Sequence, residues 1–432
     1  MENKVEVFLP KSYDLVVGDT FQLYYRGIIV ASNPYCYSIV ATCEKGKNFP
    51  RYFEYTPKEV GSHKLNISVY DANLNLLGSA DTILNVVAPT PAKKIINVLC
   101  LGASTTAGGE WINEVNRRIT AKDGEPKGLG FDGVNFVGNC KKGDVCFEAF
   151  GGWEWRNFTS SNEGAVWVEA PNTKTVEDQH SVWKDENGAL WQLETLQVDY
   201  LKFNRYQYHD APKLVSGTLY HVKNAVNQEP IKYYSSFSEK VSPFYDYQSK
   251  KLDFRKYLDK LGVNKLDIVY IYLGGNGLMR TEAQTFSRAE FCKIVVKEAK
   301  VLVDLILQDC PNVKIKLMSG AFPSLKGGLG SNYGSEEPFN NRLDLINYYT
   351  ELGKAYESWC EEEKYKGNLE YINLSGQFDS EYNFPHIEKP VNVRSEKTEW
   401  FDVNGVHPAP CGYMQIADAV YRNLVKECFS EK

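Results

Sequence analysis

The chain shows two different patterns of apolar and polar positions, one in its first 88 residues and another in the remainder. In the first 88 residues, short runs rich in β-branched and aromatic side chains are separated by turn clusters such as Asp71-Ala72-Asn73. Such runs predict β-strands. They span residues 5–9, 21–25, 35–42, 64–70 and 82–87. Residues 1–88 are therefore expected to form a small all-β sandwich of immunoglobulin-like type, although no Cys, Trp, Cys signature is present.

The pattern of apolar and polar residues changes after residues 89–94, which are expected to form a stiff, proline-containing linker. Strand-like apolar runs then alternate with longer amphipathic stretches. The apolar runs cover 95–101, 134–137, 268–273, 313–318 and 369–372, and the helical stretches cover 288–307, 342–363 and 412–428. This alternation predicts an α/β domain over residues 95–432, with a mostly parallel sheet between two helical layers in a three-layer α/β/α sandwich.

Two segments interrupt the α/β pattern. Residues 159–250 contain Asn187-Gly188 between two apolar runs, which is a strong hairpin signal, so we expect a β-rich insertion there. The glycine-rich stretch 319–334 predicts a long loop suited to a lid.

Composition narrows the class of protein. The 432 residues carry a formal charge of −6, which argues against nucleic acid as a partner because nucleic-acid binders normally have a basic face. The 28 tyrosines and 8 tryptophans fit a sugar-binding protein and a β-rich protein equally well. No run of about eighteen apolar residues predicts a membrane span. No apolar segment follows Met1; we expect a secreted, periplasmic or cell-surface bacterial protein if a signal was removed, and a cytoplasmic one if Met1 is native.

Two short segments, far apart in the chain, carry candidate chemistry. Ser104 follows the apolar run 95–101 at a glycine-containing turn, which places it at the C-terminal end of a strand, where open α/β sheets bind ligands. His407 precedes the last helical stretch, and a serine needs such a base to become a nucleophile. Asn276 and Gly152 each follow another predicted strand. An asparagine amide and a glycine N–H can both stabilise an oxyanion.

These segments resemble the blocks of the GDSL or SGNH hydrolase family, in the same order. The matching segments are Gly102-Ala103-Ser104, Gly152, Gly274-Gly275-Asn276 and Val406-His407-Pro408 followed by Gly412-Tyr413. The resemblance implies a flavodoxin-like SGNH fold, Ser104 as the nucleophile and His407 as the base. It also implies an oxyanion hole built from the N–H groups of Ser104 and Gly152 and the side chain of Asn276. It implies no metal or organic cofactor.

The chain departs from the family pattern at the position that orients the histidine. The family usually has an aspartate three residues before the histidine, and this chain has Asn404. An amide oxygen can accept a hydrogen bond from the imidazole, whereas an amide NH₂ facing the ring favours the wrong tautomer, which can cost a factor on the order of 10⁴ in rate. Asp402 is an alternative carboxylate, because residues 402 and 404 lie on the same side of an extended segment.

Three functions are compatible with these observations. The first is a serine esterase that removes acyl groups, most simply acetyl, from a carbohydrate or polysaccharide, with Trp153 and Trp155 lining the substrate cleft. The second is a catalytically weak glycan-binding or adhesion protein on the same scaffold. The third is a lipase or acyl-thioesterase, which needs a large apolar cleft.

Overall fold

The computed structural model describes most of the chain outside the predicted insertion and loop. The described residues are 4–160, 166–169, 182–186, 190–197, 200–205, 217–221, 231–233, 235–238, 242–246, 249, 251–323 and 342–431. Contacts divide the chain into two units, one made of Met1–Trp155 and Asp259–Lys432 and the other of Arg156–Leu258. Residues 324–334 of the predicted lid and the Asn187-Gly188 turn lie outside the described residues.

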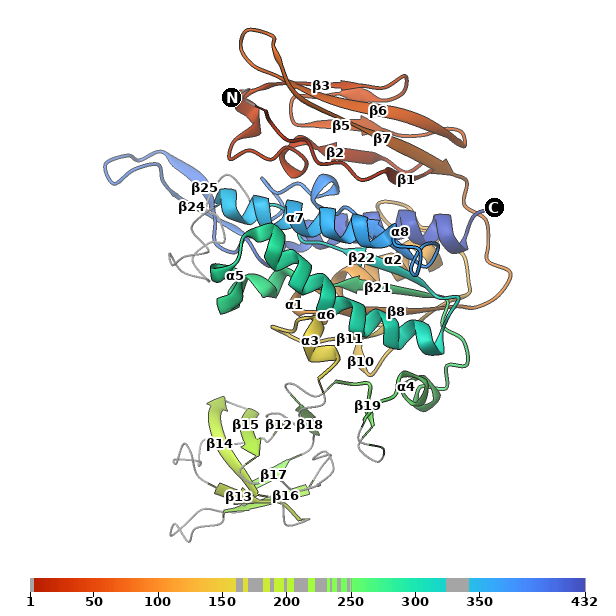
Figure 1. Ribbon diagram of the computed structural model, residues 1–432, viewed down its shortest axis with the longest axis vertical. Coiled ribbons are helices and arrows are strands. Elements are labelled where there is room, and N and C mark those ends of the chain that lie inside the picture. The colour runs from red at the N-terminus through yellow and green to blue at the C-terminus, as the bar shows by residue number, and fades with distance from the viewer. Residues whose placement is uncertain are drawn as a thin grey trace. The chain divides into compact units, whose positions relative to one another are not determined.

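A parallel sheet forms the centre of the larger unit (Figure 1). β8 (Ile96–Gly102) pairs on one side with β21 (Ile268–Tyr272), which continues to β22 (Lys314–Met318) and β23 (Leu369–Ile372). On its other side β8 pairs first with β9 (Val134–Val137) and then with β11 (Val145–Ala149). Only β10 (Cys140–Lys142) runs antiparallel within the described sheet. The four carboxyl ends of β8, β11, β21 and β22 therefore lie along one edge.

Both faces of this sheet are buried, which explains the continuous apolar runs in its strands. Val98 and Cys100 of β8 belong to one core cluster with residues of α2 (Glu110–Thr120) and α8 (Pro410–Cys428). Leu99 and Leu101 alternate with them, so they point to the other face, and they too are fully buried. The other helices of this unit are α1 (Ser104–Ala107), α5 (Thr281–Thr285), α6 (Arg288–Asp309) and α7 (Arg342–Cys360), of which α6 and α7 pack together.

The mixed α/β fold expected from the sequence is confirmed. The three-layer arrangement stays a prediction. None of the helices in the described part of the chain is long and apolar enough to cross a bilayer.

The N-terminal region contains two sheets. One has the order β1 (Ser12–Val16), β7 (Leu76–Val87), β6 (Gly61–Tyr70) and β3 (Ser38–Thr42); the other has β2 (Phe21–Tyr24), β5 (Tyr52–Tyr55) and β4 (Lys47–Asn48). Residues of both sheets share one apolar cluster, including Leu15, Leu23, Phe53, Ile67 and Leu84. The immunoglobulin-like sandwich and the boundary at residue 88 stay predictions.

One predicted strand of this region differs in the structure. The run 5–9 forms only an isolated bridge between Val7 and Ile29 instead of a strand. The linker at 89–94 stays a prediction; at its start the N–H of Thr90 donates to the carbonyl of Phe429 at 2.6 Å, and Pro89 bridges to Ser430.

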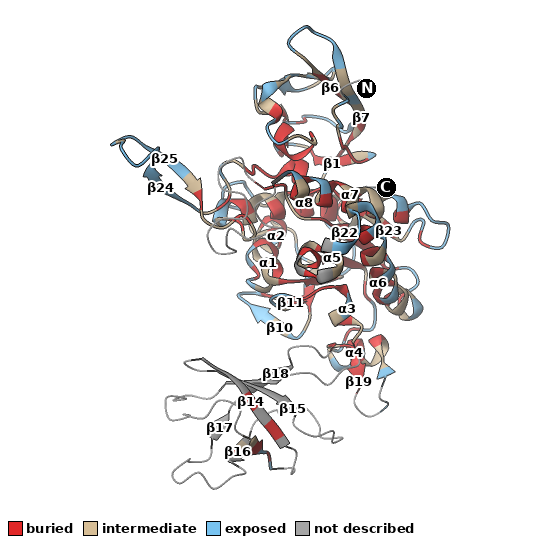
Figure 2. Ribbon diagram, turned by 60° about the vertical axis from the view of Figure 1, so that its left-hand side comes forward, coloured by how far each residue is buried: buried red, intermediate tan, exposed pale blue. Residues whose placement is uncertain are grey.

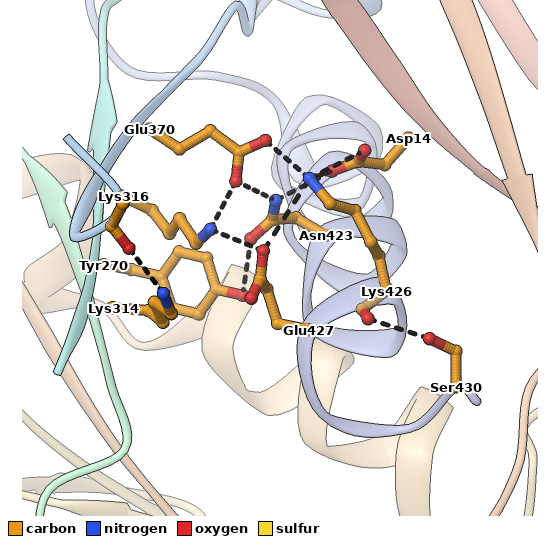
Figure 3. A network of polar contacts seen from close by, with 10 residues as sticks. Asp14, Tyr270, Lys314, Lys316, Glu370, Asn423, Lys426, Glu427 and Ser430 are labelled. Carbon is orange, nitrogen blue, oxygen red and sulfur yellow. Dashed lines mark hydrogen bonds and ion pairs between the residues drawn. The ribbon is translucent and has the colours of Figure 1, made fainter. Parts of the chain in front are cut away.

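A buried polar network joins β1 to the sheet and to α8 (Figure 3). The Nζ of Lys426 lies 2.6 Å from Glu370 and 3.1 Å from Asp14, and Lys316, whose side chain is 2% exposed, pairs with Glu370 and with Glu427. Burial and the nearby Glu370 raise the pKa of Asp14 to about 6. Burial alone would also raise the pKa of Glu370, but Lys316 and Lys426 outweigh it and hold that pKa at about 2.

A second ionic contact lies at the same interface. Asp19, at the turn after β1, is 9% exposed. Its carboxylate pairs with Arg118 of α2 at 2.5 Å and with Arg422 of α8 at 2.7 Å.

The N-terminal region also contacts the carboxyl edge of the sheet. The hydroxyl of Ser375 in η6 (Ser375–Gln377) donates to the carbonyl of Gly27 in η1 (Tyr25–Gly27) at 2.7 Å. A Cβ on Gly27 would lie 1.7 Å from the carbonyl oxygen of Ser375, so the two backbones touch. Arg26, 1% exposed, donates to the carbonyl of Pro323 at 2.8 Å, in the segment after β22.

The smaller unit contains a seven-stranded antiparallel sheet. Its strands, in spatial order, are β17 (Ile231–Tyr233), β16 (Gly217–His221), β13 (Val182–Lys184), β14 (Leu190–Gln197), β15 (Tyr200–Arg205), β12 (Val166–Glu169) and β18 (Ser235–Ser238). β13 and β14 flank the predicted Asn187-Gly188 turn and pair with each other. The remaining short elements of the insertion and its flanks are α3 (Trp155–Phe158), β19 (Tyr245–Asp246), β20 (Lys251–Leu252) and α4 (Phe254–Lys260).

Candidate active site

Ser104 is presented at the point where β8 ends and α1 begins. Ala103, just before it, has an extended backbone, and its carbonyl accepts the N–H groups of Thr106 and Ala107. A Cβ on Gly102 would lie 2.1 Å from the hydroxyl of Thr106, so only glycine allows this tight turn from strand to helix. The turn leaves Ser104 half-buried at the carboxyl edge of the sheet.

His407 is held in a turn closed by Asn404. The side-chain oxygen of Asn404 accepts the N–H of Val406 at 3.0 Å and the N–H of His407 at 2.9 Å. This is a local turn of the kind that asparagine favours, and it fixes the loop before α8.

The structure brings the two predicted catalytic side chains together. The Nε2 of His407 lies 2.7 Å from the Oγ of Ser104, although 303 positions separate them in the chain. Burial lowers the pKa of His407 below its usual value, which keeps the imidazole neutral near pH 7. A neutral imidazole in hydrogen-bond contact with a serine has the geometry of a nucleophile and its base.

The other ring nitrogen contacts an amide nitrogen. The Nδ2 of Asn404 lies 3.3 Å from the Nδ1 of His407. Because the Asn404 oxygen already accepts two backbone N–H groups, turning the amide round would break both hydrogen bonds. The amide NH₂ therefore faces Nδ1 and donates to it, which favours the imidazole tautomer that carries its proton on Nε2.

Asp402, the alternative carboxylate, ends β25 (Thr398–Asp402) and pairs in register with His386 of β24 (His386–Pro390). Its side chain is 7% exposed. Its role in orienting His407 stays a prediction.

Asn276 lies in η4 (Gly275–Met279), directly after β21. One N–H of its amide donates to the carbonyl of Trp153 at 3.0 Å, which fixes the side chain and leaves the second N–H for another acceptor. Asn276 and Ser104 line the same pocket.

Gly152 lies in the turn after β11, where the N–H of Trp153 donates to the carbonyl of Phe150 at 3.2 Å. Its φ is +75°, and a Cβ there would meet no atom within 4 Å, so the backbone conformation rather than crowding requires glycine. This turn is adjacent to the end of β8, because the N–H of Phe150 donates to the carbonyl of Gly102.

The two tryptophans differ from the expectation of a substrate surface. Trp155 is 1% exposed, donates to the hydroxyl of Tyr356 at 2.9 Å and packs against Trp359. Trp153 is 3% exposed and packs on Phe150 with ring centroids 4.1 Å apart. Both rings are thus packed against other aromatic side chains in the interior, which the chain position alone did not reveal.

The pocket beside Ser104 has a volume of about 70 Å³. Its walls are mostly apolar and include side chains that sequence reasoning missed: Tyr272, Leu278, Tyr349, Phe378, Phe384 and Ile416. Tyr349 is within the helical pattern of α7 and Ile416 within that of α8, so neither differed in sequence from an ordinary core residue. Among the residues that the structure describes, no group of three His, Cys, Asp or Glu side chains is placed to hold a metal ion.

No protein-family model and no curated protein matches the chain. Among solved structures, it is similar to a carbohydrate esterase family 2 enzyme plus carbohydrate binding domain from Corynascus thermopiles (Myceliophthora fergusii), with 11% identity, a TM-score of 0.32, and coverage of 98% of this chain and 92% of that chain. It is also similar to an acetyl xylan esterase from the rumen bacterium Butyrivibrio proteoclasticus, with 10% identity, a TM-score of 0.30, and coverage of 99% and 96%. A carbohydrate acetylesterase family member from Sinorhizobium meliloti has 10% identity, a TM-score of 0.33, and coverage of 77% and 99%. Likenesses at these TM-scores assign no family to the chain, so the case for its function rests on the geometry around Ser104 and His407.

Proposed function

We propose that the protein is a serine esterase that removes short acyl groups, acetyl above all, from a carbohydrate. The observation that carries the proposal is the 2.7 Å contact between the Oγ of Ser104 and the Nε2 of His407 at a small pocket lined by Asn276. A serine, a base and an oxyanion donor at one sheet edge are the parts that acyl transfer needs.

The chemistry follows from these parts. The Oγ of Ser104 attacks the ester carbonyl carbon while its proton passes to Nε2 of His407. The second N–H of Asn276, with the N–H groups of Ser104 and Gly152, stabilises the oxyanion. The C–O bond to the sugar then breaks, and the departing alkoxide takes the proton from His407. A water molecule, deprotonated by His407, releases the acid from the acyl-enzyme and restores Ser104.

The size of the pocket supports a short acyl group. Its volume of about 70 Å³ is about half that of a cavity that holds benzene, which is about 150 Å³. A two-carbon acyl group fits such a space, and the long chain of a lipid ester does not. The apolar walls suit a methyl group next to the reacting carbonyl.

The orientation of the Asn404 amide supports a second candidate, a glycan-binding protein with weak hydrolytic activity. An NH₂ group that donates to Nδ1 leaves the proton on Nε2, so His407 in this state donates to Ser104 instead of accepting its proton. Turnover then requires the less stable tautomer, and a slow enzyme is the direct consequence.

Release of acetate from p-nitrophenyl acetate and from acetylated xylan separates the two candidates. We expect Ser104→Ala to abolish hydrolysis of both with an unchanged melting temperature. A fluorophosphonate probe should add its mass to the peptide that contains Ser104, and not in the variant. Hydrolysis that survives in Ser104→Ala would contradict the esterase, whereas glycan binding without measurable hydrolysis would favour the second candidate.

A further inference from the structure

A two-stranded hairpin projects from the pocket rim. β24 and β25 pair over five residues each; β24 is exposed along its whole length, and β25 is exposed except at Phe401 and Asp402 next to the base of the hairpin (Figures 1 and 2). A hairpin of two strands is marginally stable in water by itself, so its side chains must supply much of its order.

Both ends of the hairpin enter the pocket wall. Phe384, two residues before β24, lines the pocket, and Gly405 and Val406, shortly after β25, line it as well. The N–H of Val403 donates to the carbonyl of Pro385 at 2.9 Å and closes the base of the hairpin. The turn that holds His407 is therefore a direct continuation of β25.

One face of the hairpin carries an ordered set of aromatic side chains. Trp400 stacks on His386 with ring centroids 4.2 Å apart and an angle of 16° between the planes, and Tyr382 meets it edge-on at 6.1 Å. The indole Nε1 donates to the carboxylate of Glu388 at 3.2 Å, and the guanidinium of Arg51 lies over Tyr382 at 4.5 Å. The rings are thus fixed before any ligand arrives.

These rings remain open to solvent. Trp400 is 41% exposed and Tyr382 is 46% exposed. His386 covers one face of the indole, and the exposed fraction of Trp400 is the part that His386 and Tyr382 leave uncovered. Contiguous exposed aromatic area is typical of binding surfaces, where Tyr and Trp are enriched because each combines an apolar ring with a polar group.

We infer that the Trp400 platform, made of Tyr382, His386 and Trp400, binds the polysaccharide chain that carries the ester into the pocket. This inference rests on the proposed function. The C–H face of a sugar ring is apolar and weakly positive, and it complements the negative face of an indole. Trp400 and Asn404 are four residues apart, at most about 14 Å along an extended strand, so a chain of a few sugars reaches from the platform to Ser104.

The position of the Trp400 platform beside the pocket favours a polysaccharide over a protein as its ligand. A polysaccharide whose ester lies at Ser104 must leave the pocket across its rim, and the hairpin continues that rim. Polar groups for the sugar hydroxyls, such as the carboxylate of Glu388, lie beside the rings.

The test compares a polymeric and a small substrate with the full-length protein. Trp400→Ala should raise KM for acetylated xylan roughly tenfold, the factor that corresponds to about 1.4 kcal/mol of lost contact. It should leave kcat/KM for p-nitrophenyl acetate unchanged, because the Val403–Pro385 hydrogen bond and the Asn404 turn hold the base of the hairpin and His407 without Trp400. Trp400→Phe should restore most of the affinity. Ile387→Ala is the matched control, because Ile387 is 42% exposed on the opposite face of the same hairpin.

Retardation of the protein in gels containing acetylated or deacetylated xylan makes the result independent of catalysis. We expect Ser104→Ala to be retarded like the wild type, and the double variant with Trp400→Ala to lose the retardation. An equal loss on both substrates, an equal effect of Ile387→Ala, or retardation that Trp400→Ala does not change would overturn the inference. Retardation that depends on Trp400 in a protein without esterase activity would support it while refuting the proposed enzyme.

Discussion

On the proposed function, replacing Asn404 by aspartate should raise the rate of ester hydrolysis. In the structure the amide oxygen closes the turn before His407, and the amide nitrogen lies 3.3 Å from Nδ1. An aspartate can keep the turn with one oxygen and accept a hydrogen bond from the Nδ1–H of His407 with the other. Nε2 would then be free to accept the proton of Ser104.

The magnitude follows from the contacts of the amide. The hydrogen bond from the amide to Nδ1 stabilises the wrong tautomer by about 1 kcal/mol, and the right tautomer would leave two N–H groups facing each other at a cost of about 1–3 kcal/mol. Together these contributions amount to about 2–4 kcal/mol, which corresponds to roughly 30-fold to 1,000-fold in rate. Stabilisation of the imidazolium by the new charge would add to this gain.

The assay is kcat/KM for p-nitrophenyl acetate as a function of pH. The base must be neutral to act, so the wild-type rate should fall only as the pH drops through the pKa of His407, which burial lowers below about 6.5. Asn404→Asp should raise the plateau and move the acid limb to higher pH, because the carboxylate stabilises protonated His407.

Asn392→Asp is the matched control. Asn392 is exposed and also closes a local turn, with its oxygen accepting the N–H of Arg394 at 3.0 Å, so the same change in charge should leave the rate unaltered. An unchanged or slower rate in a folded Asn404→Asp protein would refute the tautomer argument. If Asp402→Asn then removed activity, Asp402 would be the orienting carboxylate.

Three further predictions concern the oxyanion and the packing around the site. Asn276→Ala should lower kcat about 10²-fold to 10³-fold with little change in KM, measured on p-nitrophenyl acetate, and an effect confined to KM would argue against the oxyanion role. Lys316→Met should lower the free energy of unfolding by about 1.5–3 kcal/mol in urea titrations, because Glu370 and Glu427 each lose one of the two lysines that pair with them and keep only Lys426. Lys314→Met, two residues earlier in β22, should cost no more than about 1 kcal/mol, and equal losses would contradict the special role of the buried lysine. Gly27→Ala places a Cβ 1.7 Å from a carbonyl oxygen of η6, so it should lower the free energy of unfolding by about 3 kcal/mol or more and should also lower esterase activity. Gly61→Ala is the control, because the nearest atom to its Cβ would be 3.4 Å away, and its melting temperature should equal that of the wild type.

Apolar runs predicted five of the six parallel strands of the described sheet, because such runs need no partner to be recognised; no run marked β11. The runs at 134–137 and 369–372 match β9 and β23. β1 was missed because Asp14 interrupts its apolar pattern. That carboxylate is buried against Lys426, a residue of α8 more than 400 positions away, and no local pattern reveals such a pair.

The candidate site likewise has features that the sequence predicted and features that it could not predict. The meeting of Ser104 with His407 could be expected from motifs placed at strand ends. The orientation of the Asn404 amide could not, since it depends on which backbone N–H groups need an acceptor. The aromatic residues chosen from sequence are buried, whereas Trp400, in a short charged segment, gave no periodic signal and lies exposed beside the pocket.

The contact between Gly27 and Ser375 limits how the N-terminal region can be gained or lost during evolution. When an accessory domain is exchanged between enzymes, both surfaces at its interface must be stable when they are exposed to solvent. Here the interface contains touching backbones, and Asp19 is a counter-ion for Arg118 and Arg422. A gene fragment without the first ninety codons would leave those two arginines without that partner and the wall beside the pocket without its support. The N-terminal region should therefore be lost, gained and diversified only together with the α/β part of the chain.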